Sequence, residues 1–332
     1  MRQKIENWRQ ESIEKLEKDE AEHTATQYRA IVGCLKFDET DQDKIFESIA
    51  SVATDNPGTC TWVLKQPKIQ SWMRCTRDST FLLLTGYPGS GKSVLSTQIA
   101  TFIKSSGESL VITHFCTYLY ETSCDYDHIL RSILIQLIQS NTDLIAYVYH
   151  RLVLTKRTSS SRTIEELIRE LMRAGSPVPS QARCIHLIID GLEECKQDKQ
   201  ESVMTMLEKI VAAAESSEST ICKVLVSGRT FQAGIKRSRN KHIVSLSDEK
   251  QNLDGAMACY SSSRLAILRP KMLEMSVTDT DIKGLEESIV ARADGRSEIL
   301  YALYIWLTQS LTGMFLWARL VLDYLTSNML YT

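Results

Sequence analysis

The sequence lacks several features that would assign a function at once: it has no Cys-x-x-Cys pair, no strong net charge and no long uninterrupted apolar run. Its nine cysteines are scattered singly, which gives no support for a zinc site of the usual spacing. The formal net charge of -2 provides no bulk attraction to nucleic acid or to an anionic membrane. The odd cysteine count and the charged first residues, MRQKIENW, predict a reducing, cytoplasmic compartment.

Two apolar runs near the C-terminus, at 299–307 and 314–322, complicate the prediction of a soluble protein. Together they approach the length of a membrane span. Polar residues lie between them, however, and Arg319 falls inside the second run. Two buried helices are therefore favoured over a membrane span, and a membrane-attached ATPase stays an alternative.

A glycine-rich octapeptide, GYPGSGKS, is present at residues 86–93. It follows the apolar run 81–85 and precedes a helical pattern from Val94, so it fits the P-loop consensus G-x-x-x-x-G-K-[ST] in its strand–loop–helix setting. Glycines let backbone N–H groups turn toward phosphate oxygens, and a helix N-terminus adds partial positive charge. The residues expected to bind the phosphates of ATP or GTP are Gly86, Pro88, Gly89, Ser90, Gly91, Lys92 and Ser93.

Two of these residues have individual roles in the consensus. Lys92, expected on a solvent-facing loop, would reach the β- and γ-phosphates, and the Ser93 hydroxyl would bind Mg²⁺. An acidic cluster ends another apolar run, HLIIDGLEE at 186–194. Asp190 ends this strand and would lie beside the P-loop in a doubly wound sheet, where it can also hold Mg²⁺. Glu194 is the candidate base for the attacking water, and a simple charged turn is the alternative.

A third motif, VLVSGR at 224–229, places Arg229 directly after a strand. A guanidinium binds phosphate in a bidentate manner, so Arg229 is the candidate sensor of the γ-phosphate; a surface arginine at a strand end is the alternative. An additional strand separates the P-loop strand from the acidic strand in the sequence. This arrangement is typical of ATPases with a catalytic glutamate and not of small nucleoside kinases.

Apolar runs alternate with helical patterns through the middle of the chain. Near-continuous apolar strands separated by helices predict an α/β fold, a P-loop NTPase with a parallel, doubly wound sheet covered on both faces. The runs interpreted as strands are 81–85, 110–116, 185–190, 224–227 and 242–246.

The flanking regions have helical patterns. A charged amphipathic helix is expected over 1–30, with Ile5, Trp8, Ile13 and Leu16 on one face, followed by an acidic break at 38–43 and a helix over 44–53. A buried helix is expected at 129–138, and Thr163-Ile-Glu-Glu166 is a capping box that opens another, stopped by Gly175 and Pro177. The predicted division is a helical N-terminal segment 1–55, a P-loop core 56–250 and a helical subdomain 251–332.

Taken in order, GYPGSGKS, LIIDGLEEC, VLVSGR and GMFLWARLVL (313–322) resemble the NACHT P-loop domains of fungal STAND proteins, the relatives of NOD-like receptors. The stretch from Gly58 to Trp72 is similar to the nephrocystin-like N-terminal form of that domain. The resemblance implies an ATP- or GTP-operated switch with Mg²⁺, in which nucleotide sets the packing of a helical lid and of partner modules. For the charged N-terminal helix, packing on the core is favoured, and self-association is the alternative. By position, the resemblance gives Lys92, Ser93, Asp190, Glu194 and Arg229 the roles proposed above.

The sequence departs from that family in three respects. Glu193 stands where the family often has the second Asp of Asp-x-x-Asp-Glu, which predicts slow hydrolysis, and a nucleotide-binding scaffold without significant turnover stays an alternative. No WD40, ankyrin or TPR repeats are evident. Residues 296–313 interrupt the family pattern ADG-MFLWARLVL, and we interpret them as an aberrant insertion from a retained intron.

Overall fold

The computed structural model describes residues 2–38, 40–174, 184–217, 220–229, 231, 241–274, 278–293 and 322–323; within these ranges it describes the side chains from Glu14 onward, except those of Glu121, Lys271, Glu274, Ser288 and residues 290–293. Its centre is one parallel five-stranded sheet in the order β2-β3-β4-β1-β5. This confirms the predicted α/β fold of the P-loop NTPase type. The strands are β1 (Phe81–Thr85), β2 (Ser109–Phe115), β3 (Cys184–Asp190), β4 (Ile221–Gly228) and β5 (Lys241–Ser245).

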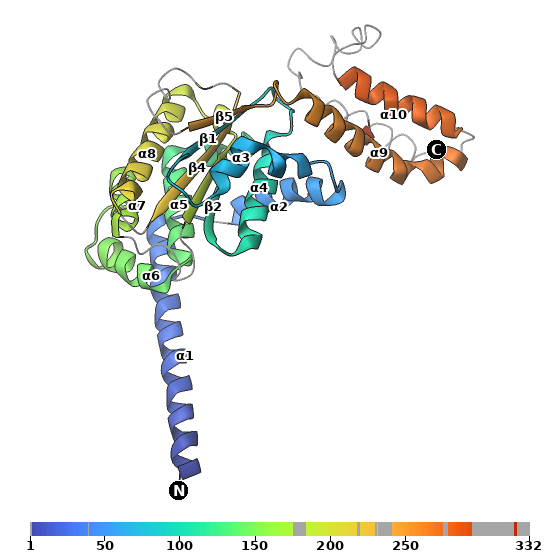
Figure 1. Cartoon of the computed structure of the whole chain (residues 1–332). Helices are drawn as coiled ribbons and strands as arrows, with labels where there is room; N and C mark the ends of the chain where they lie inside the picture. Colours follow the sequence, from blue (N-terminus) through green and yellow to red (C-terminus); the bar gives the residue numbers. More distant parts are fainter. Residues whose placement is uncertain are drawn as a thin grey trace.

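Helices cover both faces of the sheet, as Figure 1 shows. Because successive strand side chains point to opposite faces, Leu83 of β1 joins one apolar cluster and Leu82 and Leu84 join the other. The first cluster includes α5 (Tyr126–Gln139), α7 (Ser161–Ala174) and α8 (Gln197–Glu215). The second includes α3 (Pro67–Met73) and α4 (Lys92–Ser106). The doubly wound arrangement therefore follows from strands that are apolar on both sides.

The N-terminal helix α1 (Arg2–Leu35) is longer than predicted and extends away from the sheet (Figure 1). It contacts the core through Ile31 and Leu35, which are buried. Leu16, by contrast, is 68 % exposed, so the predicted apolar face does not pack on the described core at this position. The side chains of Ile5, Trp8 and Ile13 lie outside the described residues. Burial of α1 is concentrated at its C-terminal end.

Two predicted helix starts are wrong by a few residues. Helix α2 (Thr40–Asp55) begins inside the predicted acidic break, because the Asp38 carboxylate accepts a hydrogen bond from the Thr40 N–H (2.9 Å). Helix α7 begins before the predicted capping box, since the Ser160 hydroxyl accepts from the Thr163 N–H (3.3 Å). Ser160 is therefore the capping residue, and Thr163 belongs to the first turn.

The remaining elements connect or follow the sheet. The region after residue 250 is helical in its described part, as expected, and buries Met257 and Leu265 in a third apolar cluster. The insertion 296–313, most of the 313–322 motif, Gly175 and Pro177 lie outside the described residues, and the domain boundaries stay predictions. The elements are η1 (Thr61–Lys65), η2 (Glu121–Cys124), α6 (Thr142–Val148), η3 (Tyr149–Leu154), η4 (Leu192–Glu194), α9 (Lys250–Glu274) and α10 (Asp279–Ala293).

Two glutamine side chains form hydrogen bonds with the outward-facing backbone groups of the edge strand β2. The Gln42 amide donates to the Phe115 carbonyl (3.1 Å) and accepts from its N–H (2.8 Å). Two residues earlier, the Gln136 amide accepts from the Thr113 N–H (3.0 Å) and donates to its carbonyl (2.8 Å). Each amide replaces the backbone of a missing neighbouring strand, so these edge groups are satisfied without another strand.

Replacing Gln136 by leucine should lower the free energy of unfolding by about 2–3 kcal/mol, because the Thr113 N–H and carbonyl lose their partners while remaining largely buried. Urea denaturation followed by circular dichroism measures this change. Gln98→Leu within α4 is the control and should stay within about 0.5 kcal/mol of wild type. Equal effects of the two variants would show that the glutamine does not stabilise the edge.

Candidate functional site

The loop after β1 is shaped for phosphate binding by its glycines. Gly89 (φ 72°) and Gly91 (φ 88°) have left-handed backbone conformations. A Cβ on Gly86 would lie 2.7 Å from the Ser90 hydroxyl oxygen, so no larger residue fits there without a shift. Helix α4 begins at Lys92, directly after the left-handed Gly91, and its N-terminal N–H groups face the loop. The predicted strand–loop–helix unit is confirmed.

Lys92 differs from the prediction in its environment. It is the first residue of α4 and is only 7 % exposed, so its expected place on a solvent-facing loop is wrong. Its ammonium donates to the carbonyls of Gly86 (2.9 Å) and Tyr87 (3.1 Å). It also forms an ion pair with Glu193 Oε1 at 3.1 Å. Glu193, which the sequence marked only as a family departure, is thus a direct partner of the P-loop lysine.

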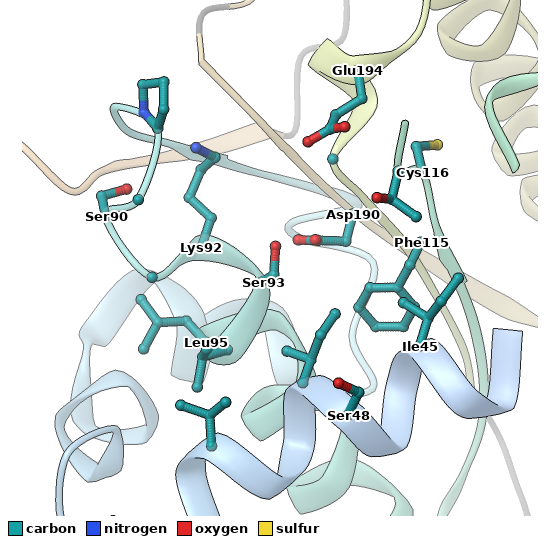
Figure 2. Close-up of a pocket in the computed structure, with 18 of the residues that line it drawn as sticks. Ile45, Ser48, Ser90, Lys92, Ser93, Leu95, Phe115, Cys116, Asp190 and Glu194 are labelled. Atoms are coloured by element: carbon teal, nitrogen blue, oxygen red, sulfur yellow. The ribbon is translucent and has the colours of Figure 1, made fainter. Parts of the chain in front are cut away.

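Asp190 ends β3 and lies beside α4, as expected from the topology. Its Oδ1 accepts hydrogen bonds from Ser96 (2.8 Å) and Ser227 (2.6 Å). Burial raises the pKa of Asp190, and these hydroxyl donors partly oppose that rise. Figure 2 shows the Ser93 and Asp190 side chains pointing toward each other. The two predicted Mg²⁺ residues are therefore adjacent.

Glu194 and Arg229 line the same cavity as the P-loop and Asp190. Glu194 ends η4, and its Oε2 accepts from the Tyr118 N–H at 2.9 Å. Partial burial raises the pKa of Glu194, as do the neighbouring Glu193 and Asp190 carboxylates. The Arg229 cation has the opposite effect on that pKa, which places its charge near Glu194.

One cavity of about 780 Å³ contains this constellation, a volume within the range of small-molecule sites. Of the predicted site residues only Gly86 does not line it. Part of its wall, which the sequence did not assign to the site, is apolar and comes from α2, η1 and α9 through Ile45, Trp62 and Leu253. Tyr118 also lines it, and Ser96 and Ser227 support Asp190 from outside. The only sequence signal for Ser96 was its place one turn after Ser93.

Buried polar atoms without a hydrogen-bond partner indicate which kind of ligand the cavity can bind. Among the described residues, the Ser90 hydroxyl, Glu193 Oε2 and the Trp62 indole N–H are buried without a hydrogen-bond partner. Hydroxyl and backbone donors suit phosphate oxygens, and the oxygens of Ser93 and Asp190 are of the type that Mg²⁺ binds. The described part of the chain holds no group of three or more His, Cys, Asp or Glu side chains suited to a metal.

In a comparison with known families, the family model "Nephrocystin 3, N-terminal" matches residues 58–229. That range begins at Gly58, before β1, and ends at Arg229, so it includes the P-loop, Asp190 and Glu194. The match therefore contains every site residue that the sequence predicted. A comparison with curated proteins found no match.

Solved structures with partial similarity include Cdc6p from Pyrobaculum aerophilum, with 10 % identity, a TM-score of 0.37 and coverage of 63 % of this chain and 55 % of that chain. C. elegans PCH-2 has 13 % identity and a TM-score of 0.33, with 91 % and 73 % covered. Drosophila ORC bound to DNA has 12 % identity and a TM-score of 0.35, with 81 % and 43 % covered. The chain thus spans about half the length of Cdc6p, and these scores are too low to assign a function.

Proposed function

This chain belongs to the nephrocystin 3 N-terminal family, and we propose that it is a signalling switch that binds Mg-ATP or Mg-GTP and hydrolyses it slowly. By family and fold it is a P-loop NTPase of the NACHT/STAND-related type. The observation that carries the proposal is that the P-loop, Asp190, Glu194 and Arg229 line one cavity of nucleotide size.

Each side chain has a role in this proposal. The loop N–H groups and Lys92 bind the β- and γ-phosphates, and Ser93 with Asp190 would hold Mg²⁺, which neutralises phosphate charge when bound. Glu194 accepts the proton of the attacking water, and its raised pKa brings it closer to the range useful for a general base. Arg229, exposed at the cavity wall, contacts the γ-phosphate.

The ion pair between Lys92 and Glu193 gives the switch a physical basis. In this structure the Lys92 ammonium is fully engaged by Glu193 and two loop carbonyls. Phosphate binding would exchange the Glu193 contact for phosphate oxygens and free η4, which carries both Glu193 and Glu194. A ligand shifts a conformational equilibrium only by its differential affinity for the two states, and this exchange is one source of that difference.

Two alternatives are distinguished by further observations. A nucleotide-binding scaffold without significant turnover is favoured by the engagement of Glu194 with the Tyr118 N–H, which holds the candidate base in place. A membrane-attached ATPase would use residues 299–325, nearly all outside the described residues. No helix in the described part of the chain is long and apolar enough to cross a membrane.

The nine free cysteines support the proposed cytoplasmic location. Self-association or binding of protein partners also stays part of the proposal.

Titration calorimetry of the full chain with ATP and GTP, each with and without Mg²⁺, tests the proposed function. We expect one site with micromolar or tighter affinity and a clear gain from Mg²⁺. Comparing the two nucleotides also assigns the base preference. Absence of binding for both nucleotides in a folded sample would refute the switch and the scaffold together.

Replacing Glu193 by glutamine should tighten ATP binding on the order of tenfold when Mg²⁺ is removed with EDTA. The change frees Lys92 from its ion pair and removes a negative charge near the phosphate site. Fluorescence polarisation with a labelled ATP measures the affinity. Glu194→Gln is the matched control, because it removes the same charge without touching the Lys92 pair. An equal gain in both variants, or none in Glu193→Gln, would contradict the proposed exchange.

A further inference from the structure

Ser227 is a buried polar residue of the central strand β4, and the VLVSGR motif of the sequence left it without a role. It directly follows Val226, which pairs in register with Ile189 of β3. Ser227 therefore lies level with Asp190, the next residue of β3. The three residues before Ser227 are apolar, and a hydroxyl buried among apolar side chains requires hydrogen-bond partners.

The Ser227 hydroxyl joins two neighbouring parts of the candidate site. It donates to Asp190 Oδ1 at 2.6 Å and accepts from the Gly191 N–H at 2.9 Å. A hydroxyl has one proton to donate, so the two bonds use it once as a donor and once as an acceptor. The Gly191 N–H, the hydroxyl and the carboxylate thus form a continuous chain, in which each hydrogen bond polarises the next.

Gly191 determines how the chain leaves β3 and enters η4. Its backbone is left-handed (φ 70°), and a Cβ at this position would lie 2.4 Å from the Cys116 carbonyl oxygen. Its own carbonyl accepts from the Glu194 N–H at 2.9 Å, so Gly191 also begins η4. The orientation of η4 therefore depends on Gly191, whose N–H is held by Ser227.

Ser96 provides a comparison within the same site. Its hydroxyl donates from α4 to the same Asp190 Oδ1 at 2.8 Å, and it is also completely buried. Within the described residues, however, the Ser96 hydroxyl forms no hydrogen bond with Gly191 or η4. Both serines therefore support the carboxylate, and only Ser227 also holds the start of η4.

We propose that Ser227 is a positioning residue that couples the Asp190 carboxylate to η4. Its hydroxyl fixes where η4 begins and therefore where Glu193 and Glu194 lie relative to Asp190. Glu193 is the partner of Lys92 and Glu194 is the candidate base, so the positions of both carboxylates depend on this hydroxyl. The effect of Ser227 on hydrolysis rests on the proposed function, whereas its effect on η4 exists without nucleotide.

Hydrogen–deuterium exchange of the nucleotide-free full chain tests this coupling. In Ser227→Ala the Gly191 N–H loses its acceptor, so the amides of Gly191 and Glu194 should exchange at least about tenfold faster than in wild type. Amides of β1 correct for any change in global stability.

Ser96→Ala is the matched control for this exchange experiment, because it removes a donor to the same carboxylate oxygen. Exchange at Gly191 should stay within about threefold of wild type in this variant. Equal acceleration in the two variants, or no acceleration in Ser227→Ala, would overturn the proposal.

Single-turnover ATP hydrolysis tests whether the coupling serves the proposed reaction. Each variant removes one donor to Asp190, so both should change Mg-ATP affinity by the same factor within about threefold. The rate of the chemical step should fall at least about tenfold further in Ser227→Ala than in Ser96→Ala, because only the first releases η4 and Glu194. Equal rates in the two variants would refute the positioning role. Absence of ATP binding or turnover in wild type would count against the proposed switch alone, and exchange at Gly191 would still decide whether Ser227 holds η4.

Discussion

Replacing Lys92 by methionine should weaken Mg-ATP binding by at least about 100-fold. Methionine keeps the buried stem of the side chain but removes the ammonium, which is the only part that can reach phosphate. A charge-assisted hydrogen bond contributes about 1.5–3 kcal/mol, and contacts to two phosphates are lost. Fluorescence polarisation with labelled ATP measures the change, and circular dichroism verifies the fold.

This variant needs a matched control because Lys92 also has a structural partner. Without Lys92, the largely buried Glu193 carboxylate loses its ion pair, which destabilises the loop independently of nucleotide. The double variant Lys92→Met with Glu193→Gln removes both charges and should recover stability but not ATP affinity. Recovered affinity in the double variant, or unchanged affinity in Lys92→Met, would contradict the assignment of Lys92 to phosphate binding.

Local signals in the sequence were sufficient for the sheet and the phosphate loop. Strands β1 to β4 were predictable because most of their residues are buried on both faces and they therefore consist of short apolar runs, whereas β5, in which only Val244 is buried, was predicted from its apolar run alone. The loop conformation of residues 86–93 was predictable from its own sequence, since only glycine readily adopts the left-handed backbone conformation of Gly89 and Gly91. The place of Asp190 beside the loop followed from the rule that parallel strands present their carboxyl ends at one edge.

Contacts between distant segments could not be predicted in the same way. Gln42 bonds to Phe115, and Lys92 pairs with Glu193, but no spacing rule connects residues so far apart in the chain. Polar residues in a helix are ordinarily assigned to solvent, so the role of Gln42 at the sheet edge had no local signal. The predicted start of α7 was wrong for another reason. Ser160 and Thr163 are both residue types that cap helices, and only the backbone conformation decides which of them is the cap.

Replacing Glu194 by glutamine should slow single-turnover ATP hydrolysis by about 10²–10⁴-fold while changing Mg-ATP affinity little. Glutamine keeps the acceptor for the Tyr118 N–H and therefore the position of η4, but it cannot take a proton from water. Rapid quenching with radiolabelled ATP at enzyme excess measures the chemical step without product release.

The same substitution at the adjacent carboxylate, Glu193, lets this experiment distinguish the hydrolysing switch from the scaffold without turnover. Glu193 forms an ion pair with Lys92, whereas the charge of Arg229 acts on Glu194, so the proposal assigns the attacking water to Glu194. Glu193→Gln should therefore retain hydrolysis within about tenfold of wild type. Equal rates in wild type and Glu194→Gln would favour the scaffold without turnover. Loss of hydrolysis in Glu193→Gln alone would instead assign the base to Glu193 and make Glu194 a positioning residue for η4.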